Sequence, residues 1–248
     1  PEWAARLERI SRDPSGTPEV DDPSRFFKEW FKDRVAGWLE TDLIAYRMAK
    51  EIDRQLRPDL LLVYLPGVDR LSHLLWSAVE PAERYPEALR LSVDQRARHL
   101  GALRAHYRTV DRLIGSLLED FGPDDLVLVV SDHGFEPVVA SPVALTGGHE
   151  SPAAAAGLSY ARAPGIRPGS RSEDTSVNDV APTILAWPGL PAARDMDGEP
   201  AAFVEVERVP PIPSYDVGRI ERSDEQSGDG ESIEGSMIEE LRSLGYVE

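Results

Sequence analysis

The stretch that decides the fold is DLVLVVSDHG, residues 125–134, in which an apolar, β-forming run leads directly into Ser-Asp-His-Gly. A second stretch, DLLLVYLPGVDRLSH at residues 59–73, follows the same plan and places Asp69 and His73 after its apolar run. Runs with so little polar alternation predict strands that are buried on both faces of a parallel sheet. Ligands of open α/β sheets bind beyond the carboxyl ends of such strands. We therefore expect residues 59–65 and 125–131 to be neighbouring or near-neighbouring core strands.

The polar residues after these runs are typical of a metal site. Together with a histidine that follows Gly147-Gly148, they form a set of five candidate ligands: Asp69, His73, Asp132, His133 and His149. Zinc is bound in proteins by imidazole nitrogen and carboxylate oxygen, and a catalytic site keeps one position open for water or substrate. The chain has no cysteine, which excludes a thiolate site and leaves no disulfide from which to infer a compartment. We expect a site for two divalent ions.

In this order the segments resemble the type I phosphodiesterase/nucleotide pyrophosphatase branch of the alkaline phosphatase superfamily. The resemblance runs from about Arg57 to about Pro200 and continues after His149 through PGI at residues 164–166, DVAPTIL at 179–185 and DMDG at 195–198. It implies an α/β, three-layer sandwich with a largely parallel central sheet. It also implies hydrolysis or transfer of phosphate or sulfate esters with two zinc ions, manganese being the alternative metal.

The resemblance also distributes the candidate ligands between the two ions. It assigns Asp69, His73 and His149 to one ion, and Asp132 and His133 to the other. His149 takes the place of the family's later histidine because it is the only histidine after His133. Two ions about 3.5–4 Å apart polarise phosphoryl oxygens, activate a nucleophile and hold the leaving oxygen.

One part of the family pattern is not found in residues 1–56. The resemblance implies a strand that ends in a further metal-binding Asp, followed by a Thr or Ser nucleophile, and neither is recognisable there. The chain also begins at Pro1 rather than at Met. We expect the nucleophile upstream of residue 1, and we expect the isolated chain to be inactive or nearly so.

Three functions remain open at this point. The first is a metal-dependent phosphodiesterase, and the second is a sulfatase or a phosphoglycerate-mutase-like enzyme of the same superfamily. The third is a non-catalytic metal-binding remnant. Taken alone, the first pair also has an interpretation without a metal, in which Asp69 stabilises a turn and His73 caps a helix. Trp76 either lines a substrate pocket or packs in the core, while His99 and His106 are expected at the surface or in packing.

Composition limits the partners. Acidic residues outnumber basic ones 44 to 27, a net charge of −17, which argues against nucleic acid because phosphate neutralisation needs clustered Lys and Arg. A small-molecule phosphate ester held by metal ions stays compatible with this charge. No apolar run approaches the roughly 20 residues that span a bilayer. The oligomeric state stays open.

Apolar periodicity predicts the organisation of the 248 residues. Residues 1–36 are expected as a loop (1–25) with a short helix, 37–204 as the C-terminal part of a catalytic domain, and 205–248 as an acidic, largely disordered tail. The expected helices are 26–34, 38–56, one around 73–79, 88–121 and 180–187. Residues 158–163 are expected as a strand, 134–156 as a loop, and Ile238–Leu244 as a short helix within the tail.

Overall fold

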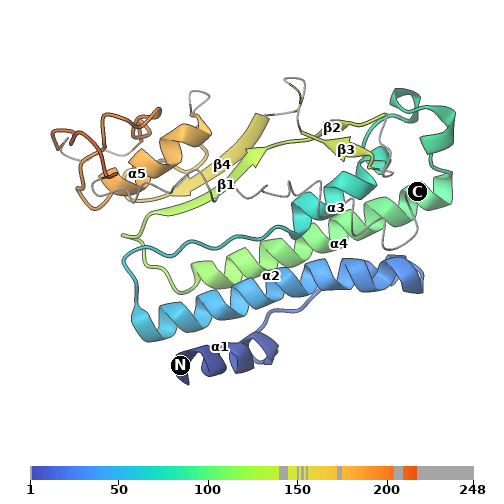
Figure 1. Ribbon diagram of the computed structural model, residues 1–248, viewed down its shortest axis with the longest axis horizontal. Coiled ribbons are helices and arrows are strands. Elements are labelled where there is room, and N and C mark those ends of the chain that lie inside the picture. Colours follow the sequence, from blue (N-terminus) through green and yellow to red (C-terminus); the bar gives the residue numbers. More distant parts are fainter. Residues whose placement is uncertain are drawn as a thin grey trace, which may run out of the picture. The chain divides into compact units, whose positions relative to one another are not determined.

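The computed structural model (Figure 1) describes residues 2–139, 145–149, 151, 154, 156–171, 175–203 and 209–216. The chain divides into two compact units. The first consists of Pro1–Gly122 with His133–Ala156, and the second of Pro123–Asp132 with Gly157–Glu248. None of the helices in the described ranges combines the length and the apolar composition that crossing a bilayer requires.

Helices make up most of the first unit. They are α1 (Glu2–Arg12), α2 (Glu29–Leu56), α3 (Gly67–Leu75) and α4 (Val93–Leu118). Short 3₁₀ turns connect them: η1 (Pro23–Phe26), η2 (Trp76–Ala78), η3 (Ala82–Arg84) and η4 (Glu87–Leu89). Figure 1 shows the two long helices α2 and α4 side by side, with the shorter α3 against α4.

The long helix α4 confirms the expected helix over residues 88–121, with a later start. Its first residue follows a capping box, in which Ser92 accepts a hydrogen bond from the Gln95 amide and the Gln95 side chain accepts one from the Ser92 amide. Such a box satisfies two helix-terminal donors at once. Residues 87–89 form the separate turn η4.

Two clusters of buried apolar side chains hold these helices together. The first joins α2, α3 and α4 through Val35, Leu71, Leu75, Ala102 and Leu103. The second joins α2 to α4 through Leu39, Leu43, Tyr46 and Leu113. Leu71 and Leu75 on α3, and Leu39, Leu43 and Tyr46 on α2, are three or four residues apart, which places them on one face of each helix. Burial of each large side chain contributes about 1.5–3 kcal/mol.

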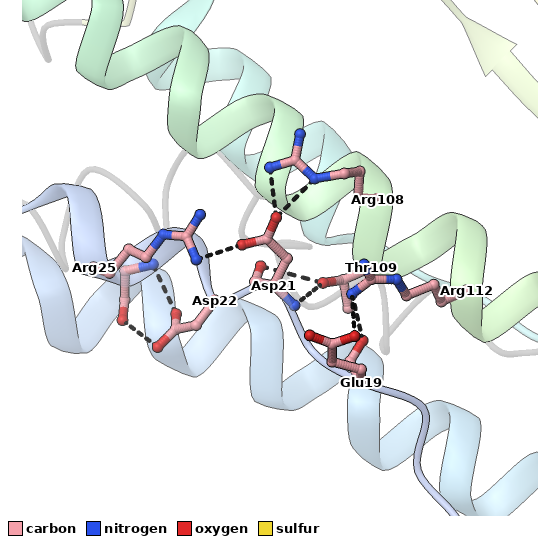
Figure 2. A network of polar contacts seen from close by, with 8 residues as sticks. Glu19, Asp21, Asp22, Arg25, Arg108, Thr109 and Arg112 are labelled. Carbon is pink, nitrogen blue, oxygen red and sulfur yellow. Dashed lines mark hydrogen bonds and ion pairs between the residues drawn. The ribbon is translucent and has the colours of Figure 1, made fainter.

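The segment between α1 and α2 is fixed to α4 by Asp21 (Figure 2). The Asp21 amide donates to Thr109 Oγ1 at 2.9 Å, and the Asp21 carboxylate accepts from Arg108 Nε at 2.7 Å. Arg25 pairs with the same carboxylate at 2.7 Å, and Arg112 donates to the Glu19 carbonyl at 2.9 Å. These contacts order a segment that has few apolar residues to bury.

The expected loop over residues 1–25 is wrong for its first half, because residues 2–12 form α1. The prolines that break a helix begin only at Pro14, and an ion pair of 3.0 Å between Arg6 and Glu51 joins α1 to α2. The expected helices 26–34 and 38–56 are also merged into one helix of 28 residues. A single interior glycine, Gly37, costs about 1 kcal/mol, which burial of its neighbours outweighs.

The expected strand over residues 59–65 is a further correction. This segment is extended, but within the described ranges it forms no strand with any partner. Leu60, Leu62 and Tyr64 are 53%, 75% and 76% exposed. An apolar run supplies side chains suited to a sheet, whereas a strand forms only when a neighbour takes up its backbone hydrogen bonds.

The strands of the described residues form two sheets of two strands each. In one, β1 (Val127–His133) pairs with β4 (Ala156–Arg162), which confirms the expected strands at 125–131 and 158–163 with shifted bounds. In the other, β2 (Glu136–Pro137) pairs antiparallel with β3 (Gly147–Gly148), within the expected loop. The described residues thus have α/β content without the expected parallel central sheet. Nor is β1 buried on both faces, since Val130 is 41% exposed.

The second unit contains η5 (Val177–Asp179) and α5 (Val180–Ala186), which confirms the expected helix at 180–187. Ser176 and Asp179 form a capping box before it. Thr183 is buried and accepts a hydrogen bond from the Ala201 amide at 2.8 Å, which joins α5 to the chain beyond it.

The expected helix at Ile238–Leu244 lies outside the described residues. The division of the chain at residues 36 and 204 stays a prediction.

Candidate metal centre

Asp69 and His73 lie on α3 and face the same side of it. Residues four apart in a helix are neighbours on its surface. Asp69 Oδ1 and His73 Nε2 are 3.5 Å apart. The expected helix around residues 73–79 needs correction here, because α3 already begins at Gly67. The helix therefore sets the distance between the two side chains.

His149 reaches Asp69 from a different part of the chain. It follows β3, and its Nε2 lies 4.0 Å from Asp69 Oδ1. The segment that carries His149 is bonded to the C-terminal end of α3 through Thr146. The Thr146 amide donates to the His73 carbonyl at 2.8 Å, and its hydroxyl donates to the Leu74 carbonyl at 2.9 Å. These two carbonyls are among those that a helix end leaves without an intrahelical partner.

His133, the last residue of β1, is the third imidazole at this point. Its Nε2 lies 3.9 Å from Asp69 Oδ1. Its ring is stacked on that of His149, with centroids 3.6 Å apart and planes 15° from parallel. One carboxylate oxygen is therefore surrounded by three imidazole nitrogens.

The hydrogen bonds of the imidazoles indicate which nitrogen faces Asp69. His73 Nδ1 lies 2.9 Å from the Gly147 carbonyl, and His133 Nδ1 lies 3.0 Å from the Gly134 carbonyl. A carbonyl oxygen only accepts, so Nδ1 donates in both cases and the neutral ring directs the lone pair of Nε2 toward Asp69. Ligating histidines in metal sites are oriented in this way by a carbonyl or carboxylate on the second nitrogen.

Asp69 Oδ1 is the atom around which the three imidazoles gather. It is buried and makes no hydrogen bond within the described part of the chain. Burial raises the pKa of the Asp69 carboxyl, but interaction with His73 and the positive charge that His73, His133 and His149 carry when protonated outweigh this effect and hold the pKa below its ordinary value. When the imidazoles are neutral and face this oxygen with their lone pairs, a bound cation would supply the positive charge instead.

The donor set fits a metal ion. One ligand atom from each of Asp69, His73 and His149 lies within 4.8 Å of the other two. Ligands bound at about 2.0–2.2 Å to one tetrahedral zinc ion are separated by roughly 3.3–3.6 Å. The distances from Asp69 to His73 and to His149 therefore need to change little. Two imidazoles and one carboxylate leave a fourth position open, as in catalytic zinc sites.

Phe135 packs against the imidazoles and limits their freedom. Its ring centroid lies 5.1 Å from that of His73, 5.6 Å from that of His133 and 5.8 Å from that of His149. The Phe135 ring also packs against the Trp76 ring, with centroids 5.0 Å apart. Of the two roles left open for Trp76, the described contacts show packing against Phe135.

The structure brings together four of the five candidate ligands, all from the first unit: Asp69, His73, His133 and His149. Asp132 is exposed and belongs to the second unit. The assignment of Asp132 and His133 to a second ion stays a prediction.

Two residues that position the cluster were not found by sequence reasoning. Thr146 is buried and connects the His149 segment to α3. Gly147 allows that approach, because a Cβ atom there would lie 2.6 Å from Trp76 Cβ and 2.8 Å from the Ser72 carbonyl oxygen. The available signal is Thr-Gly-Gly directly before His149, since paired glycines often mark a close approach of two backbones.

Comparison with protein families gives one relevant match. The family described as type I phosphodiesterase / nucleotide pyrophosphatase matches residues 8–155, which is more than half of the chain and includes all five candidate ligands. Neither a curated protein nor a solved structure matched the chain.

Proposed function

Because the chain belongs to the type I phosphodiesterase/nucleotide pyrophosphatase family, we propose that it forms the metal-binding part of a phosphoric ester hydrolase that acts on small-molecule phosphate esters. Asp69, His73 and His149 hold one divalent ion, and Asp132 and His133 contribute to a second. Zinc is the expected metal and manganese the alternative, because the ligands are imidazoles and carboxylates without a thiolate.

One observation carries the proposal. The buried Oδ1 of Asp69 lacks a hydrogen bond within the described residues, and three imidazole Nε2 atoms lie 3.5–4.0 Å from it. As turn or cap residues alone, Asp69 and His73 would not need two further histidines at the same oxygen. A non-catalytic metal-binding remnant shares this geometry, so activity has to be tested separately from binding.

The side chains have distinct roles in this proposal. Bound divalent ions polarise the phosphoryl oxygens and stabilise the charge that develops on them. Asp69 supplies the negative charge that retains a cation. His73 and His133 are held in one tautomer by the Gly147 and Gly134 carbonyls, and Phe135 keeps the three rings from rotating away.

The proposal includes an alkaline-phosphatase-like fold with a largely parallel central sheet. The exposed side chains of Leu60, Leu62 and Tyr64 support it, because a segment of this composition is normally covered in a folded domain. The nucleophile is expected outside residues 1–56. Their described helices α1 and α2 leave no strand there that could lead to a Thr or Ser at a helix start.

Metal binding is tested by titration of the chain with Co²⁺, whose visible spectrum reports ligand number. Binding is expected with one strong site that His149→Ala removes, while His99→Ala, a histidine of α4 outside the cluster, leaves it unchanged. Equal binding by both variants would contradict the proposed site.

Activity is tested with a p-nitrophenyl phosphodiester and a p-nitrophenyl sulfate. The 248-residue chain should turn over neither appreciably. The same chain extended at its N-terminus should hydrolyse the diester in a chelator-sensitive manner, and His133→Ala should abolish this. Preference for the sulfate would favour a sulfatase, and chelator-sensitive turnover by the unextended chain would contradict the expected position of the nucleophile.

A further inference from the structure

A buried carboxylate–imidazole pair lies at the other end of α3, outside the metal cluster. Asp42 on α2 is 0% exposed and His106 on α4 is 1% exposed. Asp42 Oδ2 and His106 Nε2 are 2.9 Å apart. Because a carboxylate oxygen only accepts, His106 Nε2 carries the proton and donates. Sequence reasoning placed His106 at the surface or in packing, and gave it no partner.

The second carboxylate oxygen of Asp42 reaches the start of α3. The amide of Gly67, the first residue of that helix, donates to Asp42 Oδ1 at 3.1 Å. The residue before it, Pro66, provides no side-chain cap. The first amides of a helix have no intrahelical partner, and a negative charge near them is favourable. Asp42 therefore performs, from a different helix, the function of an N-cap side chain.

Gly67 shows how closely the pair approaches α3. A Cβ atom at this position would lie 2.3 Å from His106 Nε2 and 2.4 Å from Asp42 Oδ2. Only glycine allows the helix to begin in contact with both side chains. The start of α3 is thus determined by Asp42 and His106 together.

Burying Asp42 and His106 costs desolvation free energy. Two ionisable side chains in an apolar interior lose much of their hydration, and well-packed apolar residues in their place are often as stable or more stable. A function beyond stability is therefore needed to explain it. Gly67 precedes Asp69 by two residues, within the same helical turn, and α3 carries both Asp69 and His73.

We propose that Asp42 and His106 are positioning residues for the metal centre: they hold the N-terminal end of α3 and so fix Asp69 and His73 relative to His149. This inference rests on the proposed function. Thr146 holds the C-terminal end of the same helix, so α3 is attached at both ends and cannot tilt away from the His149 segment.

The test uses a double substitution that removes the polar pair but keeps the core apolar, Asp42→Val with His106→Leu. Asp42→Asn keeps an acceptor for Gly67 and serves as the conservative variant. Tyr46→Phe is the matched control: Tyr46 is also buried on α2, bonds α4 through Ser116 Oγ at 2.8 Å, and packs in the second cluster with Leu39, Leu43 and Leu113.

Two measurements are made on the full chain. In the metal-free protein, amide hydrogen exchange at residues 67–70 should be about tenfold faster in the double variant than in the wild type, because a cap is lost. The Co²⁺ dissociation constant should rise about tenfold, the size of effect seen when residues that orient metal ligands are removed. In Asp42→Asn, the exchange rate and the Co²⁺ dissociation constant should both stay within roughly threefold of the wild-type values. Tyr46→Phe should change neither quantity.

The outcomes separate the two proposals. Exchange at residues 67–70 as slow in the double variant as in Tyr46→Phe would overturn the positioning role, as would Co²⁺ affinity equal to that of the wild type. If the double variant fails to fold, Asp42→Ala is measured in its place, and exchange at residues 67–70 and Co²⁺ affinity equal to those of Tyr46→Phe would overturn the positioning role. Co²⁺ binding by the wild type that ignores His149→Ala would overturn the proposed function instead.

Discussion

Replacing Thr146 by valine removes one hydroxyl that joins the His149 segment to α3. This hydroxyl donates to the Leu74 carbonyl at 2.9 Å and accepts from the Ser77 amide at 3.1 Å. Valine has nearly the same shape, so the change isolates the two hydrogen bonds. The Thr146 backbone bonds to His73 and Tyr85 are not touched by the substitution.

The expected loss follows from these contacts. Each buried hydrogen bond contributes about 0.5–1.5 kcal/mol, so the loss of two costs about 2 kcal/mol. For a chain of this size that corresponds to a fall in Tm of roughly 4–8 °C. A looser His149 segment should also raise the Co²⁺ dissociation constant about tenfold.

The matched control is Thr109→Val. Thr109 is buried on α4, and its hydroxyl also makes two hydrogen bonds, both with the Asp21 backbone (Figure 2). Differential scanning calorimetry should show a similar fall in Tm for both variants, whereas Co²⁺ titration should show weakened binding for Thr146→Val alone. Equal Co²⁺ affinity in the two variants would refute the argument that Thr146 positions His149.

Three further predictions concern single side chains. The hydrogen bond from Arg108 holds the pKa of Asp21 below its ordinary value, so its charged form stabilises the fold above about pH 4 and this contribution is lost as the pH falls through the folded-state pKa. Urea unfolding should therefore show that the advantage of the wild type over Asp21→Asn shrinks from pH 7 to pH 3, and a pH-independent difference would contradict this. Burial raises the pKa of Tyr85 to about 12, so the unfolded chain ionises first and wild-type stability should fall between about pH 10 and 12. Tyr85→Phe should lack that fall in the same unfolding assay, and an unchanged slope would show that another group titrates. Gly147→Ala places a Cβ against Trp76 and a backbone carbonyl that cannot move aside, so unfolding by urea should show a loss of about 1–3 kcal/mol; wild-type stability would mean that β3 shifts freely.

Strand pairing and helix boundaries illustrate what local sequence leaves open. Residues 59–65 and 125–131 have equally apolar runs, yet only the second forms a strand in the described structure, because only it has a partner, β4. Likewise, the expected helices 26–34 and 38–56 form one continuous helix, in which Val35 and Leu39 on either side of Gly37 are buried. In both cases the deciding energy comes from contacts with residues distant in the sequence.

For the candidate site, the sequence by itself identified the candidate ligands and the helix periodicity that brings two of them together. Asp69 and His73 are four residues apart, and His133 and His149 follow apolar or glycine segments, so their residue types and order are sufficient to predict a metal site of this family. Only the tertiary structure decided how they meet. The bonds of Thr146 to the end of α3, of Asp42 to its beginning, and of His106 to Asp42 join residues from 25 to 73 positions apart. Such contacts leave no periodic pattern in a sequence, because they depend on which helix faces come together when the core is buried.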